Sequence, residues 1–318
     1  MVHDDGPTCV MTDSREYEIC VKDKRREGRA ALWRQAAGEL AGAALLLLLT
    51  CLPARDALAP RPPPAHRALA AGLTVALVVQ CFDHISGAQL NPAVTLARAL
   101  GGHESAARAL ALAGAQLAGA LLGAAAAAAL GAAPAACLTR PADRVPPYQP
   151  MSYESADRHG RLLSDAGAAQ ATLAGAVCRQ AAAVEAALGG CLALANLAAW
   201  DPRTRRLRDS WPLRIGLAVA ALTFAAGEIS GASMNPVRSF APALLAARWE
   251  HQWVYWVGPL SGSCVCTALY RCVWRAAPCE LAPCGCAPCE LAPCGCERSA
   301  LSCTRPRDQI NPNTTHYS

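Results

Sequence analysis

The chain has 318 residues, of which 53% are hydrophobic and only 17% are charged. Its formal net charge of +5 is too small to indicate a nucleic-acid partner. The apolar residues are clustered, and runs such as Leu40–Leu52 and Ala109–Leu138 carry no charge, which is not typical of a soluble domain. The composition therefore favours a protein that lies in a lipid bilayer.

The first 29 residues are polar, and basic residues such as Lys24, Arg26 and Arg29 stand directly before the first apolar run. A secretory signal would place its apolar stretch closer to the start of the chain. We therefore expect a retained first span, with residues 1–29 forming a cytoplasmic tail.

Six segments resemble membrane spans, each of which needs about 20 mostly apolar residues. They are Ala31–Cys51, His66–Cys81, Ser105–Ala126, Ala169–Leu197, Leu213–Gly227 and Gln252–Val273. The predicted fold class is thus an all-α membrane protein with six transmembrane helices.

The connections between these spans predict the topology. The hairpin Asp201–Arg208 is basic and is assigned to the cytoplasm by the positive-inside rule. Both termini then lie in the cytoplasm, while Pro53–Pro64 and Thr139–Asp165 lie outside. We expect a multi-pass protein of the plasma membrane.

An internal repeat organises the chain. The segment Ile85–Ala93 is similar in sequence to Ile229–Val237. Glu39 in the first span corresponds to Glu185 in the fourth. Three spans per half is an odd number, so the second half must be inverted, with a site near the membrane midplane where the halves meet. We predict a channel domain at residues 30–275, with halves at about 30–138 and 166–275.

Each repeat contains an Asn-Pro pair that is typical of a helix start. Asn91 and Asn235 are suited to the N-cap, and Pro92 and Pro236 to the first helical position. Two half-helices are predicted, through Leu100 and Leu245. We expect irregular backbone before them, in Asp83–Leu90 and Glu228–Met234. Such backbone is tolerated at membrane depth where it lines a cavity or is buried in protein.

The meeting point of the two half-helices predicts a specific chemistry. Each Asn oxygen would cap its own helix, leaving the amide NH₂ group to face the lumen. The two helix N-termini each carry roughly half a positive charge. A neutral hydrogen-bonding solute is therefore favoured there, and protons and cations are disfavoured.

These motifs resemble the paired Asn-Pro-Ala signatures of the aquaporin, or major intrinsic protein, family. The likeness extends from about Gly38 to Trp274 and includes Gln116 and Tyr255–Pro259. It implies six spans, two re-entrant half-helices and a homotetramer with one pore per subunit. One departure is Val237 in the second motif, where the family usually has Ala. The first motif has the usual residue, Ala93. The resemblance also implies that Glu39 and Glu185 brace the half-membrane loops.

The resemblance further implies a selectivity filter at Ala71, Thr223, Ala232 and Arg238. Water-selective members carry Phe at the first position and His at the second. Small side chains at both positions would widen the filter, which favours glycerol and urea alongside water. The motif position of Arg238 implies a fixed charge that holds solutes and repels cations.

Other positions favour the water-channel branch of the family. Ser239 follows the filter arginine, where typical glycerol channels carry Asp, and Ala243, Tyr255 and Trp256 also resemble that branch. The combination resembles the insect entomoglyceroporins, which pass glycerol although they arose within the water-specific branch. The expected function is a passive channel for water, glycerol and urea that excludes ions. The alternatives are a water-selective aquaporin, an ion-coupled secondary transporter, and an adhesion member of the same fold with little flux.

The chain has 17 cysteines, ten of them at or beyond Cys264. We interpret the other seven as small buried apolar residues rather than a disulfide framework. The decapeptide Ala277–Cys286 is repeated as Ala287–Cys296, in a Cys/Pro-rich tail (residues 276–318) that we expect to be disordered and cytoplasmic. No enzymatic activity, metal or cofactor is expected, and the expected partners are the bilayer and the permeating solutes.

Overall fold

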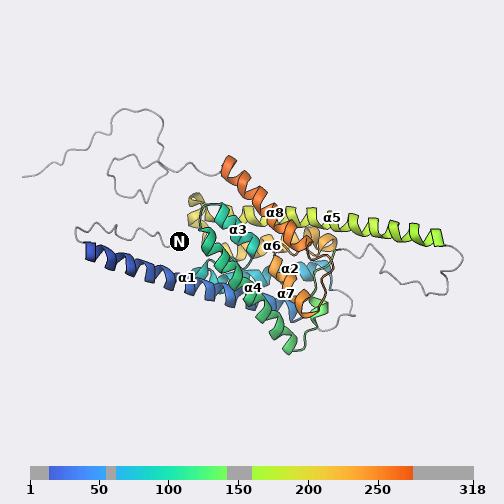
Figure 1. The fold of residues 1–318 in the computed structure, drawn as a ribbon, viewed down its shortest axis with the longest axis horizontal. Coiled ribbons are helices and arrows are strands. Elements are labelled where there is room, and N and C mark those ends of the chain that lie inside the picture. The colour runs from blue at the N-terminus through green and yellow to red at the C-terminus, as the bar shows by residue number, and fades with distance from the viewer. Residues whose placement is uncertain (1–13, 55–61, 142–159, 275–318) are drawn as a thin grey trace, which may run out of the picture. The chain divides into compact units, whose positions relative to one another are not determined.

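The computed structural model describes residues 14–54, 62–141 and 160–274, and every regular element in these ranges is helical (Figure 1). The long helices are α1 (Ser14–Cys51), α2 (Pro64–Ser86), α4 (Ala106–Ala129), α5 (Gly160–Trp200), α6 (Trp211–Ser230) and α8 (Val254–Leu269). Two short helices, α3 (Pro92–Leu100) and α7 (Pro236–Leu245), lie between them. The predicted Cys-rich tail lies outside the described residues.

Within the described residues, five helical stretches are long and apolar enough to cross a membrane. They are Ala30–Cys51, Pro64–Ser86, Ala106–Ala129, Gly175–Trp200 and Trp211–Ser230. These stretches match the first five predicted spans to within a few residues. The sixth prediction corresponds to α8, which has 16 residues and continues directly into a π-helical segment, Tyr270–Trp274.

Two helices start many residues before their predicted spans. Helix α1 begins at Ser14, inside the predicted cytoplasmic tail, and α5 begins at Gly160. Lys, Arg and Glu are good helix formers, so a helix can continue past the apolar stretch into a polar segment. The hydrophobic signal marks where the membrane part of a helix lies and not where the helix itself begins.

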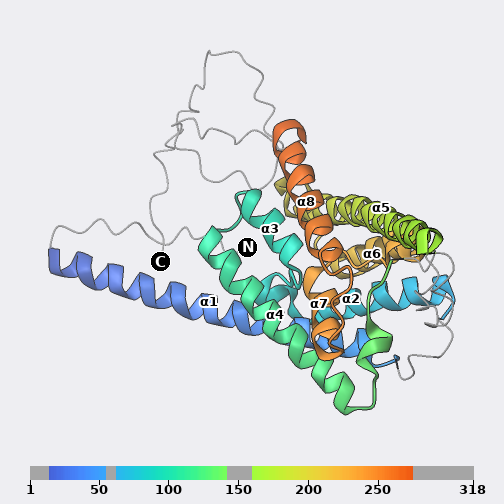
Figure 2. The same ribbon diagram turned by 45° about the vertical axis from the view of Figure 1, so that its right-hand side comes forward.

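The packing of the helices repeats between the two halves (Figures 1 and 2). Helix α1 packs along α4, and α5 packs along α8 in the same way. The short helix α3 lies against α8, and α7 lies against α4, so each half-helix contacts the other half's third long helix. The two halves are joined through α2 and α6, which pack against each other.

The crossing of α2 and α6 is very close because glycine stands at the same repeat position in both. A Cβ atom at Gly72 would lie 2.4 Å from the Gly216 carbonyl oxygen, and one at Gly216 would lie 2.6 Å from the Gly72 oxygen. Small residues allow helix backbones to approach in this way. The contact fixes the position of Ala71, which directly precedes Gly72.

The segments before the half-helices differ partly from the prediction. Helices α2 and α6 continue to Ser86 and Ser230, so the first part of each expected irregular stretch is helical. Each helix stops at a glycine in the left-handed region, a common helix C-terminus. Behind these glycines, non-glycine residues of both loops also have positive φ: Ala88 (40°), Leu90 (55°), Ala232 (47°) and Met234 (55°). Strained backbone of this kind is concentrated at functional sites.

The interpretation of the early cysteines as buried apolar residues outside any disulfide is wrong for four of them, because two form a disulfide and two are exposed. Cys51, the last residue of α1, forms a disulfide with Cys137 beyond the end of α4. They are 86 residues apart, and the pairing follows from the packing of α1 along α4. Of the remaining early cysteines, Cys81 and Cys191 are exposed and Cys178 is buried.

Candidate functional site

The N-termini of α3 and α7 meet at the two Asn-Pro pairs. The Asn91 side-chain oxygen accepts the backbone N–H of Ala93 at 2.9 Å, and Asn235 accepts that of Val237 at 3.1 Å. Both asparagines are therefore N-caps, with a proline at the first helical position of each helix.

The amide groups of these asparagines cross between the halves. Asn91 Nδ2 donates to the Met234 carbonyl at 2.8 Å, and Asn235 Nδ2 donates to the Leu90 carbonyl at 2.9 Å. The expectation that both amides are left for the lumen needs correction, because the opposite loop uses one N–H of each. An amide has two N–H donors, so each asparagine retains one for a solute.

A buried glutamate holds the first loop. Glu39 is fully buried in α1 and accepts the Ser86 hydroxyl at 2.7 Å. It also accepts the backbone N–H groups of Gln89 at 2.9 Å and Leu90 at 2.7 Å. Gln116 of α4 donates to the same carboxylate at 2.7 Å. Burying a carboxylate is costly unless hydrogen bonds compensate for the lost water, and here four donors do so.

The second loop is held in the same way. Glu185 of α5 accepts the Ser230 hydroxyl at 2.7 Å and the backbone N–H groups of Ser233 and Met234, both at 2.8 Å. The Tyr255 hydroxyl adds a bond to the Ser230 carbonyl at 2.8 Å. Both glutamates thus accept hydrogen bonds from backbone N–H groups of the strained loops.

A cavity of about 600 Å³ extends past both loops. The four residues expected in the filter line it: Ala71 from α2, Thr223 from α6, Ala232 from the second loop and Arg238 from α7. Asn91 and Asn235 line the same cavity. Pro92, Ala93, Pro236 and Val237 are not among its described lining residues; Ala93 and Val237 are buried in the helix packing instead.

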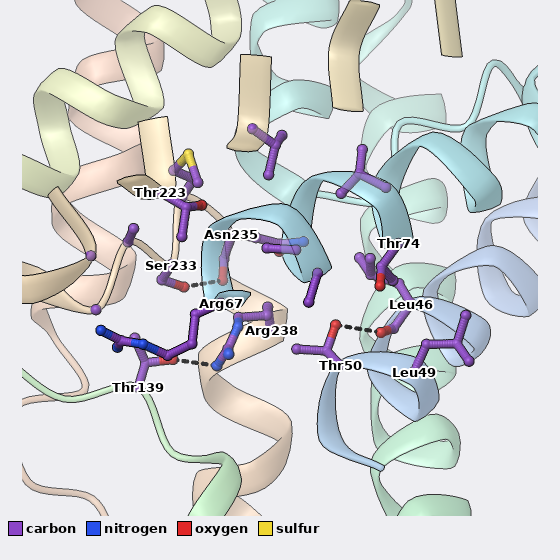
Figure 3. A pocket seen from close by; sticks show the side chains of 18 of the residues that line it. Leu46, Leu49, Thr50, Arg67, Thr74, Thr139, Thr223, Ser233, Asn235 and Arg238 are labelled. Carbon is purple, nitrogen blue, oxygen red and sulfur yellow. Dashed lines mark hydrogen bonds between the residues drawn. The ribbon is translucent and has the colours of Figure 1, made fainter. Parts of the chain in front are cut away.

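The two polar filter side chains differ in their bonding (Figure 3). Arg238 Nη1 donates to the Thr139 hydroxyl at 2.6 Å and to the Cys137 carbonyl at 3.2 Å. The Thr223 hydroxyl oxygen is shielded and has no hydrogen-bond partner within the described residues. A shielded oxygen offers no hydrogen bond to a solute in the cavity, so Thr223 contributes to the lining through its small size.

The lining residues that were not predicted from the sequence include three polar ones that bond to other residues. Thr139 lies in the long connection after α4, where no motif marks it. Arg67 and Glu228 form an ion pair between α2 and α6. Arg67 is one helical turn before Ala71, so helical spacing from the filter could have identified it.

The charges around the cavity favour neutral solutes. The two helix N-termini and the Arg238 guanidinium place positive charge along the lining. The carboxylates of Glu39 and Glu185 are saturated by donors from the loops. The described residues contain no group of three or more His, Cys, Asp or Glu side chains that could hold a metal ion.

The sequence profile of the family described as "Major intrinsic protein" matches residues 27–270. The chain belongs to this family. A similar curated member is a probable aquaporin TIP4-2 from Oryza sativa subsp. japonica, 35% identical over 62% of this chain and 65% of its own length. Aquaporin-4 from Bos taurus is 32% identical over 64% of this chain and 54% of its own length. The chain thus spans between about half and two thirds of the length of these relatives.

The fold of this family is also found in a solved structure. The aquaglyceroporin from Plasmodium falciparum superposes with a TM-score of 0.60, covering 76% of this chain and 96% of its own. At 20% identity the match concerns the fold alone. The predicted helical membrane fold with two half-helices is therefore confirmed, and the chain is a multi-pass membrane protein.

Proposed function

We propose that the chain is a passive channel for water, glycerol and urea that excludes protons and ions. The observation that carries the proposal is the lining of one cavity by Ala71, Thr223 and Arg238 together. A methyl group and an unpartnered hydroxyl leave room beside the guanidinium for a three-carbon polyol. The polyol could accept a hydrogen bond from the Arg238 guanidinium.

Exclusion of cations follows from the same cavity. A cation near Asn91 and Asn235 faces two helix N-termini and loses hydration there. The Glu228 carboxylate, which also lines the cavity, is paired with Arg67. The two cross-loop amide bonds hold these N-termini together. In this proposal Arg238 adds a second barrier with its permanent charge.

The proposed topology places the disulfide outside the cell. The basic connection Asp201–Arg208 follows α5 and is bonded to the end of α8 through Asp201 and Tyr270. Helices α1 and α5 end at opposite ends of the bundle (Figure 1), and Cys51 is the last residue of α1. Disulfides persist in oxidising compartments. This supports cytoplasmic termini and a plasma-membrane location, and the family likeness supports a homotetramer.

A water-selective channel is the second candidate, and one observation favours it. Arg67 and Glu228 form an ion pair and line the cavity. Arg67 lies four residues before Ala71 and Glu228 five residues after Thr223, so the pair is about one helical turn from the filter on the side of Cys51. A bridge at that point occupies part of the width that the two small filter side chains leave. In that case solute size would be limited before the filter.

Parallel uptake assays in expressing oocytes test the proposal. The wild-type chain should take up water, glycerol and urea without an ion gradient. The Ala71→Phe, Thr223→His double variant should lose most glycerol and urea uptake and keep measurable water permeability. Surface expression must be measured alongside, because overpacking costs about 1–3 kcal/mol.

The control separates the two candidates. If the wild-type chain passes only water and the Arg67→Ala variant gains glycerol uptake, the ion pair sets the size limit and the water-selective function holds. If glycerol flux persists in the double variant at equal surface expression, the determinant of solute range lies elsewhere.

A further inference from the structure

The segment that follows α4 is attached to α1 by two bonds. Cys137, at the end of the 3₁₀ turn Pro134–Cys137, is joined to Cys51 by the disulfide. The backbone N–H of Ala133 donates to the Ala54 carbonyl at 2.7 Å. Both partners on the α1 side lie where that helix ends, so the position of the segment depends on α1.

The same segment holds the guanidinium of Arg238. Its Nη1 donates to the carbonyl of the disulfide-bonded Cys137 and, two residues on, to the Thr139 hydroxyl. The Ser239 hydroxyl donates to that same Thr139 oxygen at 2.8 Å. Figure 3 shows Thr139 and Arg238 joined in this way on the cavity wall.

The fit between this segment and the second loop is tight. A Cβ atom added at Gly231 would lie 2.7 Å from the Thr139 methyl carbon and 3.0 Å from the Arg140 carbonyl oxygen. A displacement of residues 137–140 would therefore move the partners of Arg238 as well as the wall against which the loop rests.

We propose that the Cys51–Cys137 disulfide is a positioning element of the filter, which keeps the Arg238 guanidinium against the cavity wall. The proposal rests on the proposed function, since it takes Arg238 as a filter residue. When the disulfide is opened, the Cys137 carbonyl loses its fixed place and the arginine gains access to the lumen beside Ala71 and Thr223. A larger solute is then hindered more than water.

The opening step needs an external dithiol. Its two thiols supply two electrons and two protons, the S–S bond breaks, and Cys51 and Cys137 each become a thiol. The dithiol is oxidised to a cyclic disulfide. The bond between Ala133 and Ala54 does not depend on this chemistry, so the segment stays near α1 after reduction.

A purely structural disulfide would behave differently. Its reduction would lower stability or the number of folded channels, which reduces the flux of every solute in the same proportion. A positioning role changes the ratio of glycerol to water permeability. Losing one hydrogen bond from a charged group shifts the population of the held conformer by about tenfold, so we expect the ratio to fall by up to that factor.

The test uses the full chain in proteoliposomes, with stopped-flow measurement of water and glycerol permeability. Oxidised protein is compared with protein reduced by dithiothreitol, and mass spectrometry verifies the state of Cys51 and Cys137. The ratio should fall on reduction, and the Cys51→Ser, Cys137→Ser double variant should match the reduced wild type. A Cys81→Ser, Cys191→Ser variant, which removes exposed free thiols, should respond as the wild type does.

Two further variants assign the effect to the arginine. Thr139→Val keeps the disulfide and removes one partner of Arg238, and it should lower the ratio in the oxidised state. Arg238→Ala has no guanidinium to release, so its ratio should not respond to dithiothreitol. An unchanged ratio in fully reduced wild type, or an equal response in Arg238→Ala, would overturn the proposal.

The outcomes also separate this proposal from the proposed function. If oxidised protein passes water and no glycerol, the proposed solute range fails. The positioning role of the disulfide is then tested with water permeability alone, which must change on reduction in the wild type and stay constant in Arg238→Ala. If no flux of either solute occurs in verified folded protein, both proposals fail.

Discussion

The two Asn-Pro loops make the same hydrogen bonds to the surrounding protein, but the half-helices that follow them carry different side chains at the cavity. In both, a buried glutamate accepts a serine hydroxyl and two successive backbone N–H groups, and an asparagine bonds to the opposite loop. Three residues after the asparagine, the first loop carries Val94 and the second carries Arg238. The arginine also has partners in the segment that follows α4, at Cys137 and Thr139.

This difference separates two tasks. The repeated contacts place two helix N-termini at the centre of the molecule, and a repeat can build them because both halves need the same support. The contacts of Arg238 occur once, at one end of the cavity, and they involve a connection that has its own disulfide. In the proposed function, the barrier to ions at the centre therefore depends on the contacts that the two halves share, whereas solute selection depends on the contacts of Arg238 that only one half has.

The largest effect is expected when the shared support is removed. Glu39→Ala and Glu185→Ala each leave a serine hydroxyl and two backbone N–H groups buried without an acceptor. At about 1–3 kcal/mol for each unsatisfied group, either variant should lose at least about 3 kcal/mol of stability. Thermal unfolding of purified protein in detergent measures the loss, with Gln180→Ala, an exposed site on α5, as the control. A large loss in only one of the two variants would contradict the equivalence of the loops.

Arg238→Ala and Val94→Ala compare the positions where the loops differ. A unit charge about 4 Å away contributes about 4 kcal/mol at an effective dielectric constant of about 20. Removing the arginine should therefore raise proton and cation leak strongly, while Val94→Ala removes no charge and should leave the leak unchanged. Electrical recording from expressing oocytes measures both. A leak that rises equally in the two variants would show that pore width and not charge sets the barrier.

A cysteine placed at equivalent positions of the two loops should have a smaller effect on water flux, and the effect should depend on the side from which a thiol reagent is applied. Ala232 and Ala88 both line the cavity and both have positive φ, so a Cys at either place adds no backbone strain. A membrane-impermeant mercurial applied outside should block water flux through Ala232→Cys, beside Arg238, and spare Ala88→Cys. The untreated variants and the treated wild type serve as controls. No block at position 232 would indicate that this residue does not line the conducting path.

Much of this arrangement could be predicted from the sequence. Asn91-Pro92 and Asn235-Pro236 give both half-helices, since an N-cap followed by proline is a strong local signal. Glu39 and Glu185 stand out because a charge inside an apolar span needs a partner. The repeat then predicts that Glu185 accepts hydrogen bonds from the same kinds of groups in the second half as Glu39 does in the first.

The remaining features depend on long-range packing. No local pattern links Cys51 to Cys137, which meet only because α1 and α4 lie side by side. Thr139 sits in a connection that resembles any polar loop. The cross-loop bonds of the asparagine amides require the two loops to be in contact, so a prediction made for each motif alone assigned both N–H groups to the lumen.

The smallest effect is expected on the face opposite Arg238, at the connection between α5 and α6. Asp201 is buried there, and Arg203 donates to it at 2.6 and 2.8 Å, which holds the pKa of the carboxyl well below its usual range. Tyr270 donates to the same group at 2.8 Å and so ties the connection to the end of α8. A lowered pKa in the folded state means that this stabilisation is fully present above the unfolded value of about 3.9 and is lost only as pH falls through the folded value.

Asp201→Asn should consequently destabilise the protein by about 1 kcal/mol at neutral pH, because Arg203 is largely exposed and its ion pair is weakened by water. The loss should be constant from pH 8 to about pH 5 and should shrink under more acidic conditions, where the wild-type carboxylate becomes protonated. Thermal unfolding across this pH range measures it, and Asp209→Asn, an exposed position eight residues further on, is the matched control. Since the contact lies far from the filter, the glycerol-to-water ratio should not change. A changed ratio would mean that solute selection is not confined to the end of the cavity that holds Arg238. The distinction between contacts that both halves share and contacts of Arg238 that select the solute would then be wrong.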